Sequence, residues 1–182
     1  MDGRREDTFM YRYFLFVFLL ICPIVMAGDE VYQSPKSFLI EAFSGDPPAP
    51  SMLWLTPKLK EDARTILAHA YIGLRVRYWL RGGRSAWVLE EIGKEKPITV
   101  GLVVEADRLE YLRVLVFRES RGWEVRHGFF TEQFARTRLD SDLSLDKDID
   151  GISGATLSVR ALTKLARLAL LFHRQVSNVD GS

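Results

Sequence analysis

The sequence predicts a single α+β domain in which helices cover an antiparallel-rich sheet, and three observations support this fold class. A period-two pattern, typical of a half-buried strand, runs from Leu74 to Leu80 and is followed by a glycine pair and a second apolar strand. A long amphipathic segment with helical spacing lies near the end of the chain. The 182 residues are 47% apolar, which is enough for the core of one ordinary domain.

Residues 1–27 are typical of a secretory signal peptide. Tyr13 to Ile21 is continuously apolar, and Val25-Met26-Ala27 supplies small residues at the positions that a signal peptidase inspects. We therefore expect cleavage after Ala27. The alternative is an uncleaved membrane anchor, but the stretch from Tyr13 to Ala27 has only 15 residues, whereas about 20 apolar residues span a bilayer.

Residues 28–71 are expected to form an N-terminal extension followed by a helix. Five prolines between Pro35 and Pro57 predict an extended or irregular segment. We expect it to dock through Phe38, Leu39, Phe43 and Trp54. A helix should then run from Pro57 to Tyr71, because proline suits a first helical turn and apolar residues recur at helical spacing. These apolar residues are Leu59, Ala63, Ile66, Leu67 and Ala70.

Residues 72–175 should form the main part of the domain, beginning with the sheet. The glycine pair Gly82-Gly83 predicts a tight hairpin turn between the first two strands. The predicted strands are Leu74–Leu80, Ala86–Leu89, Ile98–Glu105 and Tyr111–Arg118, with a further short strand at Trp123–Val125.

Two helices and a polar connection complete the predicted domain. A short helix over Phe129–Ala135 should have Thr131 as its cap and should turn Phe130 and Phe134 inward. Residues 136–148 form a polar connection. The last helix runs from Leu157 to about Arg174, with Leu162, Leu165, Ala169 and Phe172 on one face and Arg160, Lys164, Arg167 and Arg174 on the other. Residues 176–182 are expected to form a tail.

The segment Asp150-Gly-Ile-Ser-Gly-Ala-Thr156, directly before the last helix, is the motif most informative about function. Ser153, Gly154 and Ala155 leave backbone N–H groups uncovered at a helix N-terminus, where unpaired N–H groups and the helix dipole favour phosphate. Thr156 adds a hydroxyl to which a phosphate can be esterified. The alternative interpretation is that Ser153 or Thr156 simply caps the helix.

This string, Asp-x-x-Ser-Gly-Ala-Thr, resembles the attachment signature of the FMN-binding domain family. That family includes the C subunit of the sodium-translocating NADH:quinone oxidoreductase and the G subunit of Rnf-type complexes. The resemblance, which covers roughly Ile72 to Phe172, implies FMN linked through a phosphoester to Thr156. It also implies a separate, magnesium-dependent flavin transferase that uses FAD as donor. Asp150 either caps the turn or helps to orient the hydroxyl and a magnesium ion.

A second segment, Arg118 to Val125, is similar to the family's Glu-Thr-Pro-Gly type loop, which lies near the flavin. Glu119 and Gly122 match that pattern, whereas Ser120 and Arg121 replace the usual Thr and Pro. The resemblance implies that Glu119, Gly122 and Trp123 border the cofactor. An indole at Trp123 suits packing against the isoalloxazine ring, and the alternative for this side chain is the core.

Other chemistries receive little support from the sequence. Its three histidines are far apart and lack metal-ligand spacing, so we expect solvated or capping roles for His69, His127 and His173. The carboxylates between Asp140 and Asp150 lack the glycine and terminal glutamate of an EF-hand loop. A net charge of +1 gives no argument for nucleic acid as a partner.

The expected function is that of an exported electron-transfer flavoprotein. We expect it in the periplasm or on the outer face of the bacterial cytoplasmic membrane, with a membrane or periplasmic redox partner and a flavin transferase for maturation. The cofactor would supply the redox chemistry. Two other classes stay open: a flavin-free binding or assembly module of the same fold, and a flavin reductase that acts on a small substrate.

Overall fold

Six antiparallel strands form one sheet in the order β1-β6-β5-β4-β3-β2. The computed structural model describes residues 29–177, so the predicted signal peptide lies outside the described residues. The strands are β1 (Glu30–Val31), β2 (Ser51–Trp54), β3 (Arg75–Arg81), β4 (Arg84–Ile92), β5 (Pro97–Glu105) and β6 (Arg108–Phe117). Together with the helices they make one α+β domain, as the sequence predicts.

A tight turn sets the register of β3 and β4. Gly82 and Gly83 have φ angles of 57° and 78°, which a two-residue hairpin turn requires and glycine adopts without strain. The predicted turn is thereby confirmed, and Arg81 pairs with Arg84 across it. Beyond this hairpin, β4 pairs with β5 along its whole length, from Arg84 opposite Glu105 to Ile92 opposite Pro97.

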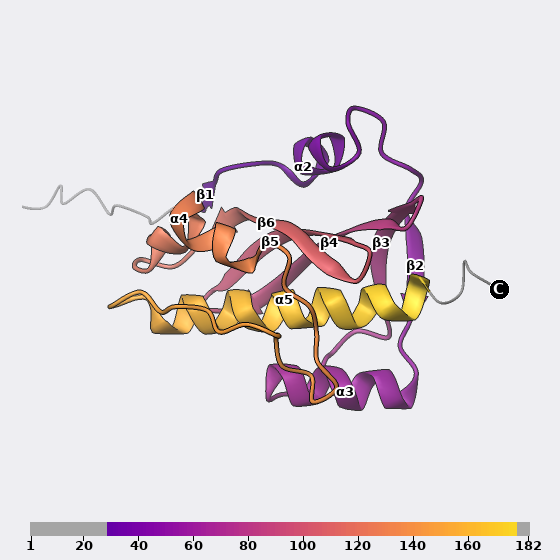
Figure 1. Ribbon diagram of the computed structural model, residues 1–182. Coiled ribbons are helices and arrows are strands. Elements are labelled where there is room, and N and C mark those ends of the chain that lie inside the picture. The colour runs from indigo at the N-terminus through magenta and orange to yellow at the C-terminus, as the bar shows by residue number, and fades with distance from the viewer. Residues whose placement is uncertain (1–28, 178–182) are drawn as a thin grey trace, which may run out of the picture.

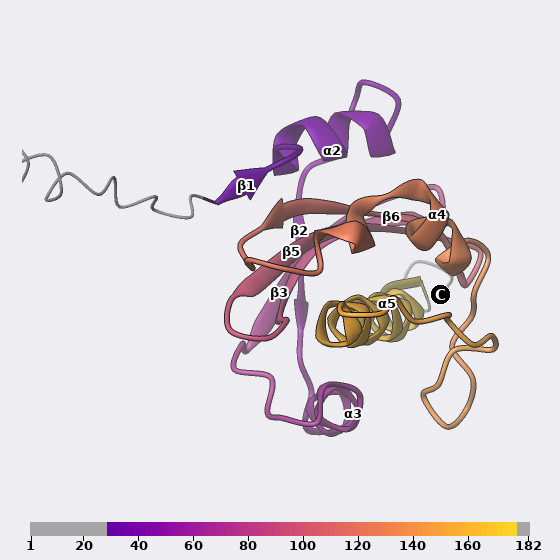
Figure 2. The same cartoon turned by 90° about the vertical axis from the view of Figure 1, so that its left-hand side faces the viewer.

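The helices lie on both faces of the sheet. In Figures 1 and 2, α5 (Thr156–Ser177) crosses one face, with α3 (Pro57–Leu67) beyond it, and α2 (Pro35–Ala42) covers the opposite face. The short helix α4 (Gly128–Thr131) lies between two 3-10 turns, η1 (Trp123–Arg126) and η2 (Glu132–Phe134). It lies at the end of the molecule where α5 begins.

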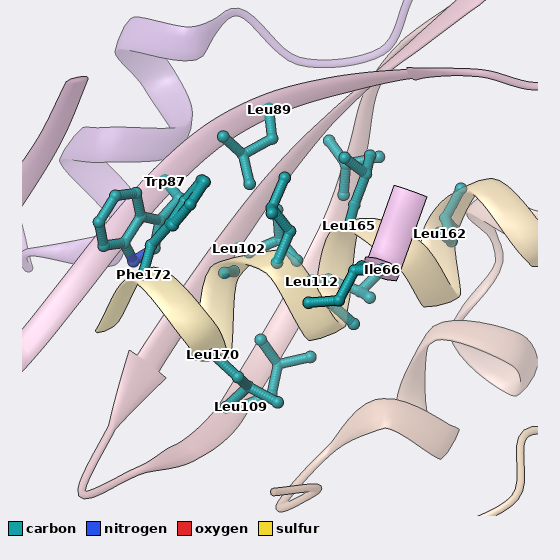
Figure 3. Close-up of a cluster of buried hydrophobic side chains, with 14 of the residues drawn as sticks. Ile66, Trp87, Leu89, Leu102, Leu109, Leu112, Leu162, Leu165, Leu170 and Phe172 are labelled. Carbon is teal, nitrogen blue, oxygen red and sulfur yellow. The ribbon is translucent and has the colours of Figure 1, made fainter. Parts of the chain in front are cut away.

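The larger part of the core lies between α5 and the sheet. The four residues predicted for the inner face of α5 are fully buried: Leu162, Leu165, Ala169 and Phe172. Figure 3 shows several of them against Trp87 and Leu102 of the sheet, with Ile66 of α3 alongside. A smaller cluster on the other face buries Phe38 of α2 against the sheet. Because one long helix fills most of one face, the position of its first residue is fixed by extensive packing.

The expected irregular extension contains a helix, so that prediction was wrong for residues 35–42. Ser34 caps α2 by accepting the Ser37 N–H at 3.0 Å, and Pro35 occupies the first turn. Docking through Phe38, Leu39 and Phe43 is confirmed, since all three are buried. Trp54 is instead 63% exposed, because β2 is the edge strand and the indole lies under Arg75.

Three further local predictions were wrong. Trp123–Val125 is not a strand but part of η1, which begins after Gly122 in the left-handed conformation. Thr131 is the last residue of α4 rather than its cap, while Phe130 and Phe134 are fully buried as expected. Helix α3 ends at Leu67 instead of Tyr71, because Ala68 adopts a left-handed φ of 61°.

His173 departs from the solvated or capping role predicted for the histidines. It is buried on α5, and its Nδ1 lies 2.7 Å from Ser85 Oγ, which in turn accepts a hydrogen bond from Trp87 Nε1. This buried polar group links α5 to β4. Within residues 29–177, no helix is long and apolar enough to span a membrane.

Candidate functional site

The predicted attachment residue, Thr156, is the first residue of α5 and is exposed. Gly154 adopts a left-handed φ of 83° just before the helix, and the Ala155 N–H closes the preceding turn on Ile152 O at 3.0 Å. Ala155 O then accepts the Val159 N–H, so Ala155 stands at the N-cap position. The long, well-packed helix therefore presents the Thr156 hydroxyl at its very start.

The beginning of α5 has the properties of an anion site. Ala155 has no side-chain acceptor, and no acidic residue lies in the first turn of this helix. The N–H groups of Thr156, Leu157 and Ser158 have no partner within a helix that starts here, and the helix dipole adds positive potential at the same point. Neither Ser153 nor Thr156 occupies the N-cap position that the capping alternative requires.

The loop after β6 is fixed near its start by the carboxylate of Glu119. Glu119 Oε1 accepts the backbone N–H groups of Lys94, Glu95 and Lys96 at 2.5, 2.7 and 2.9 Å. Burial raises the pKa of the Glu119 carboxyl, but the three N–H donors together lower it by more, so its pKa lies below the ordinary value. The loop is thus bound to the turn between β4 and β5.

The same loop is packed against α5 at Gly122. This glycine has a left-handed φ of 85°, and a Cβ added to it would lie 2.6 Å from Ser158 Oγ and 3.4 Å from Ala155 Cβ. Any other residue would have to displace the Ser158 hydroxyl and would be strained by the left-handed φ. The loop therefore joins the β4–β5 turn at one end to the start of α5 at the other.

A cavity of about 530 Å³ lies where these three segments meet, a volume within the range of about 300–1,000 Å³ typical of small-molecule sites. Two cations, Lys94 and Arg121, line it together with the hydroxyl of Thr156. The other lining residues are Glu119, Ser120, Gly154, Ala155, Leu157 and Ser158. A hydroxyl, a helix N-terminus and two cations in one cavity fit a phosphate-bearing cofactor.

Not every predicted site residue lines this cavity. Thr156, Gly154, Ala155 and Glu119 line it, and Gly122 supports its wall. The remaining three, Trp123, Asp150 and Ser153, do not line it.

Trp123 and Asp150 lie outside the cavity in defined positions. The Trp123 side chain is 44% exposed, so it does not belong to the core, and it contacts the His127 ring edge-on at a centroid distance of 5.3 Å. Asp150 is exposed, and its backbone N–H donates to Gln133 Oε1 at 2.8 Å. This bond ties the start of the attachment motif to the end of α4 and η2.

Lys94 and Ser158 are site residues that sequence reasoning missed. Lys94 comes from the β4–β5 turn, which lies 62 positions before Thr156 in the numbering. No local pattern marks this lysine, whose turn meets the cavity where its N–H groups donate to Glu119. The signal available in the sequence was Gly93, where a Cβ would lie 2.9 Å from Glu119 Oε1.

A family model described as the FMN-binding domain matches residues 93–171. The match begins at the β4–β5 turn and includes the Glu119 loop and the whole attachment motif, so every segment that lines the cavity lies within it. No curated protein and no solved structure matched the chain.

Proposed function

We propose, because a family model of the FMN-binding domain matches residues 93–171, that this protein is an exported electron-transfer flavoprotein. In this proposal FMN is joined through a phosphoester to Thr156, and the protein relays electrons to or from a membrane redox partner. The family match supports FMN as the cofactor. The proposed attachment to Thr156 is supported by one observation: this exposed threonine stands at the uncapped start of α5, in a cavity with two cations.

The attachment step is a transfer from FAD to Thr156, catalysed by a separate flavin transferase. Thr156 Oγ forms a bond to the phosphorus of the FMN half, the pyrophosphate bond breaks, AMP leaves with the electron pair, and the hydroxyl proton passes to solvent. A separate enzyme requires access to its target, and the exposure of Thr156 on a helix start meets that requirement. The N–H groups of the first turn then face the new phosphodiester.

The neighbouring residues of the cavity offset the charge of the attached group. A phosphodiester carries one negative charge, which Lys94, Arg121 and the helix dipole all favour at this position. Glu119 does not oppose them strongly, because one of its carboxylate oxygens is already bound by three N–H groups. The charge balance of the cavity is thus positive where the phosphate is proposed to lie.

Electron relay is favoured over reduction of a small substrate because the proposed site is open at the surface. The attached FMN supplies the redox chemistry, accepting and releasing electrons. Leu157 lines the cavity and is 43% exposed, and Trp123, next to Gly122, is 44% exposed. Apolar side chains around a surface cofactor suit docking of a protein partner.

Export is the part of the proposal that rests on residues 1–27 alone. Their apolar run and the Val25-Met26-Ala27 segment are typical of a signal peptide. A covalent link also suits an exported protein, since a dissociated flavin would diffuse away from the cell surface.

Covalent loading is tested by co-expressing the full chain with an FAD-dependent flavin transferase. We expect a UV-fluorescent band at the mass of the protein on a denaturing gel, and no band without the transferase. A known target protein, labelled by the same transferase, serves as the positive control. A dark band from this chain beside a labelled control would contradict the proposal.

A further inference from the structure

One oxygen of the Glu119 carboxylate holds an entire turn. Its Oε1 accepts three consecutive N–H groups, from Lys94, Glu95 and Lys96, at 2.5 to 2.9 Å. Hydrogen bonds to an ionised acceptor are stronger than neutral ones. The turn has one further internal bond, from the Gly93 N–H to Lys96 O at 3.1 Å. Its shape therefore depends mainly on a carboxylate that comes from a different loop.

The close fit around Glu119 adds to this dependence. A Cβ on Gly93 would lie 2.9 Å from Glu119 Oε1 and 3.1 Å from the Ile98 side chain. The carboxylate thus lies close against Gly93 at the start of the turn and is held by the N–H groups of residues 94–96. Glu119 is an acceptor for the turn, and this bonding directs its charge toward the backbone of residues 94–96.

Lys94 is the residue of this turn that lines the cavity with Thr156. Its own N–H makes the shortest of the three bonds to Glu119. Its Nζ also lies 3.2 Å from Glu95 Oε1 in an exposed ion pair, which contributes little by itself. The backbone bond to Glu119 is therefore the contact that fixes where the Lys94 side chain begins.

We propose that Glu119 is a positioning residue: it holds the β4–β5 turn so that Lys94 stands at the cavity, and Lys94 with Arg121 raises the reduction potential of the flavin attached to Thr156. This inference rests on the proposed function for the presence of the flavin. The physical reason is that a reduced flavin carries more negative charge than the oxidised form. Cations near it therefore favour reduction.

The sign of the potential shift separates positioning from a direct electrostatic role. If Glu119 acted directly on the flavin, removing its negative charge would raise the potential. If it acts through Lys94, its loss displaces a cation and lowers the potential. Glu119→Asp keeps the charge but shortens the side chain by one methylene, so it loses the reach for all three N–H groups. A direct role predicts little change in this variant, whereas positioning predicts a fall.

The experiment measures the midpoint potential of flavin-loaded wild type, Glu119→Ala, Glu119→Asp and Lys94→Met by spectroelectrochemistry. We expect the midpoint potentials of all three variants to lie about 30 mV below that of wild type, which corresponds to about a tenfold change in a two-electron reduction equilibrium. The double variant Glu119→Ala/Lys94→Met should fall no further than Lys94→Met alone. Glu95→Gln is the matched control, because it removes one charge from the same turn and keeps the bonds to Glu119; its potential should not fall.

A second measurement needs no flavin. Amide hydrogen exchange of Lys94, Glu95 and Lys96 in the unloaded protein should accelerate about tenfold or more in Glu119→Ala and Glu119→Asp, and should stay near wild type in Lys94→Met. Two results would overturn the positioning role when the wild type carries flavin. One is a midpoint potential that rises or stays unchanged in both Glu119 variants. The other is amide exchange that stays unchanged in these variants. A wild type without the FMN adduct overturns the proposed function as well, so the two failures are distinct.

Discussion

Gly122 allows the close approach between the loop after β6 and the start of α5. Gly122→Ala should lower the free energy of unfolding by about 1–3 kcal/mol, because it combines a left-handed φ with a methyl group 2.6 Å from Ser158 Oγ. Urea unfolding checks this value. Flavin loading by the transferase should fall with it, because the clash with Ser158 lies in the first turn of α5, close to Thr156.

Two variants separate backbone strain from the steric clash at this position. Gly45→Ala is the control for strain alone, because Gly45 has a φ of 100° and nothing lies within 4 Å of the added Cβ. It should lower the free energy of unfolding by less than Gly122→Ala does. Gly122→Ala/Ser158→Ala removes the clashing hydroxyl and should recover part of the stability. Equal costs for Gly45→Ala and Gly122→Ala would contradict the close approach.

At the residue scale, the sequence predicted the start of the last helix, which forms part of the candidate cavity. Gly154, Ala155 and Thr156 are contiguous, and a small-residue run before an amphipathic segment predicts a helix start. The position of Lys94 at the cavity could not be predicted from the sequence, because it results from a bond between two loops. The strand predicted at Trp123–Val125 was wrong for a related reason. The residues after the left-handed Gly122 enter a 3-10 turn, which a search for period-two patterns does not detect.

At the element scale, the contact between α5 and β4 contains a pH-sensitive group. Burial lowers the pKa of His173 below its ordinary value, against a smaller opposing effect of the Asp107 carboxylate. Below about pH 6.5 the unfolded chain binds a proton at this residue that the folded chain resists. The contribution of His173 to the free energy of unfolding should therefore stay constant above about pH 7 and decrease as the pH drops below about 6.5.

His173→Asn tests this prediction, because the amide oxygen keeps an acceptor near Ser85 Oγ and does not titrate. Denaturant unfolding at several pH values between about 5.5 and 8 should give a smaller pH slope for the variant than for wild type. Parallel slopes in the two proteins would show that His173 does not carry the effect.

The elements that the sequence predicted well are those with strong periodicity. The central strands and α5 each bury one continuous face, so their apolar residues recur at a regular spacing that can be recognised in the sequence. Helix α2 was missed because several prolines follow it, although Ser34 before Pro35 is a helix-start signal. The edge strand β2 breaks the rule that apolar residues are inside, since Trp54 packs against Arg75 in solvent.

At the scale of the whole molecule, the proposed function requires export before loading. We expect the protein purified from its native membrane or periplasmic fraction to begin at Gly28, because cleavage is predicted after Ala27. N-terminal sequencing checks this prediction. Recovery of Met1 or Asp2 would indicate an uncleaved anchor instead.

The central claim is that Thr156 carries FMN, and peptide mass spectrometry of four proteins co-expressed with the transferase tests it most directly. Wild type and Ser153→Ala should carry one FMN unit, Thr156→Ser should retain part of the label because it keeps the hydroxyl oxygen, and Thr156→Ala should fold and carry none. Ser153 is the matched control, since it is an exposed hydroxyl three residues earlier. An FMN adduct that persists on Thr156→Ala, or an unlabelled wild type, would contradict the account.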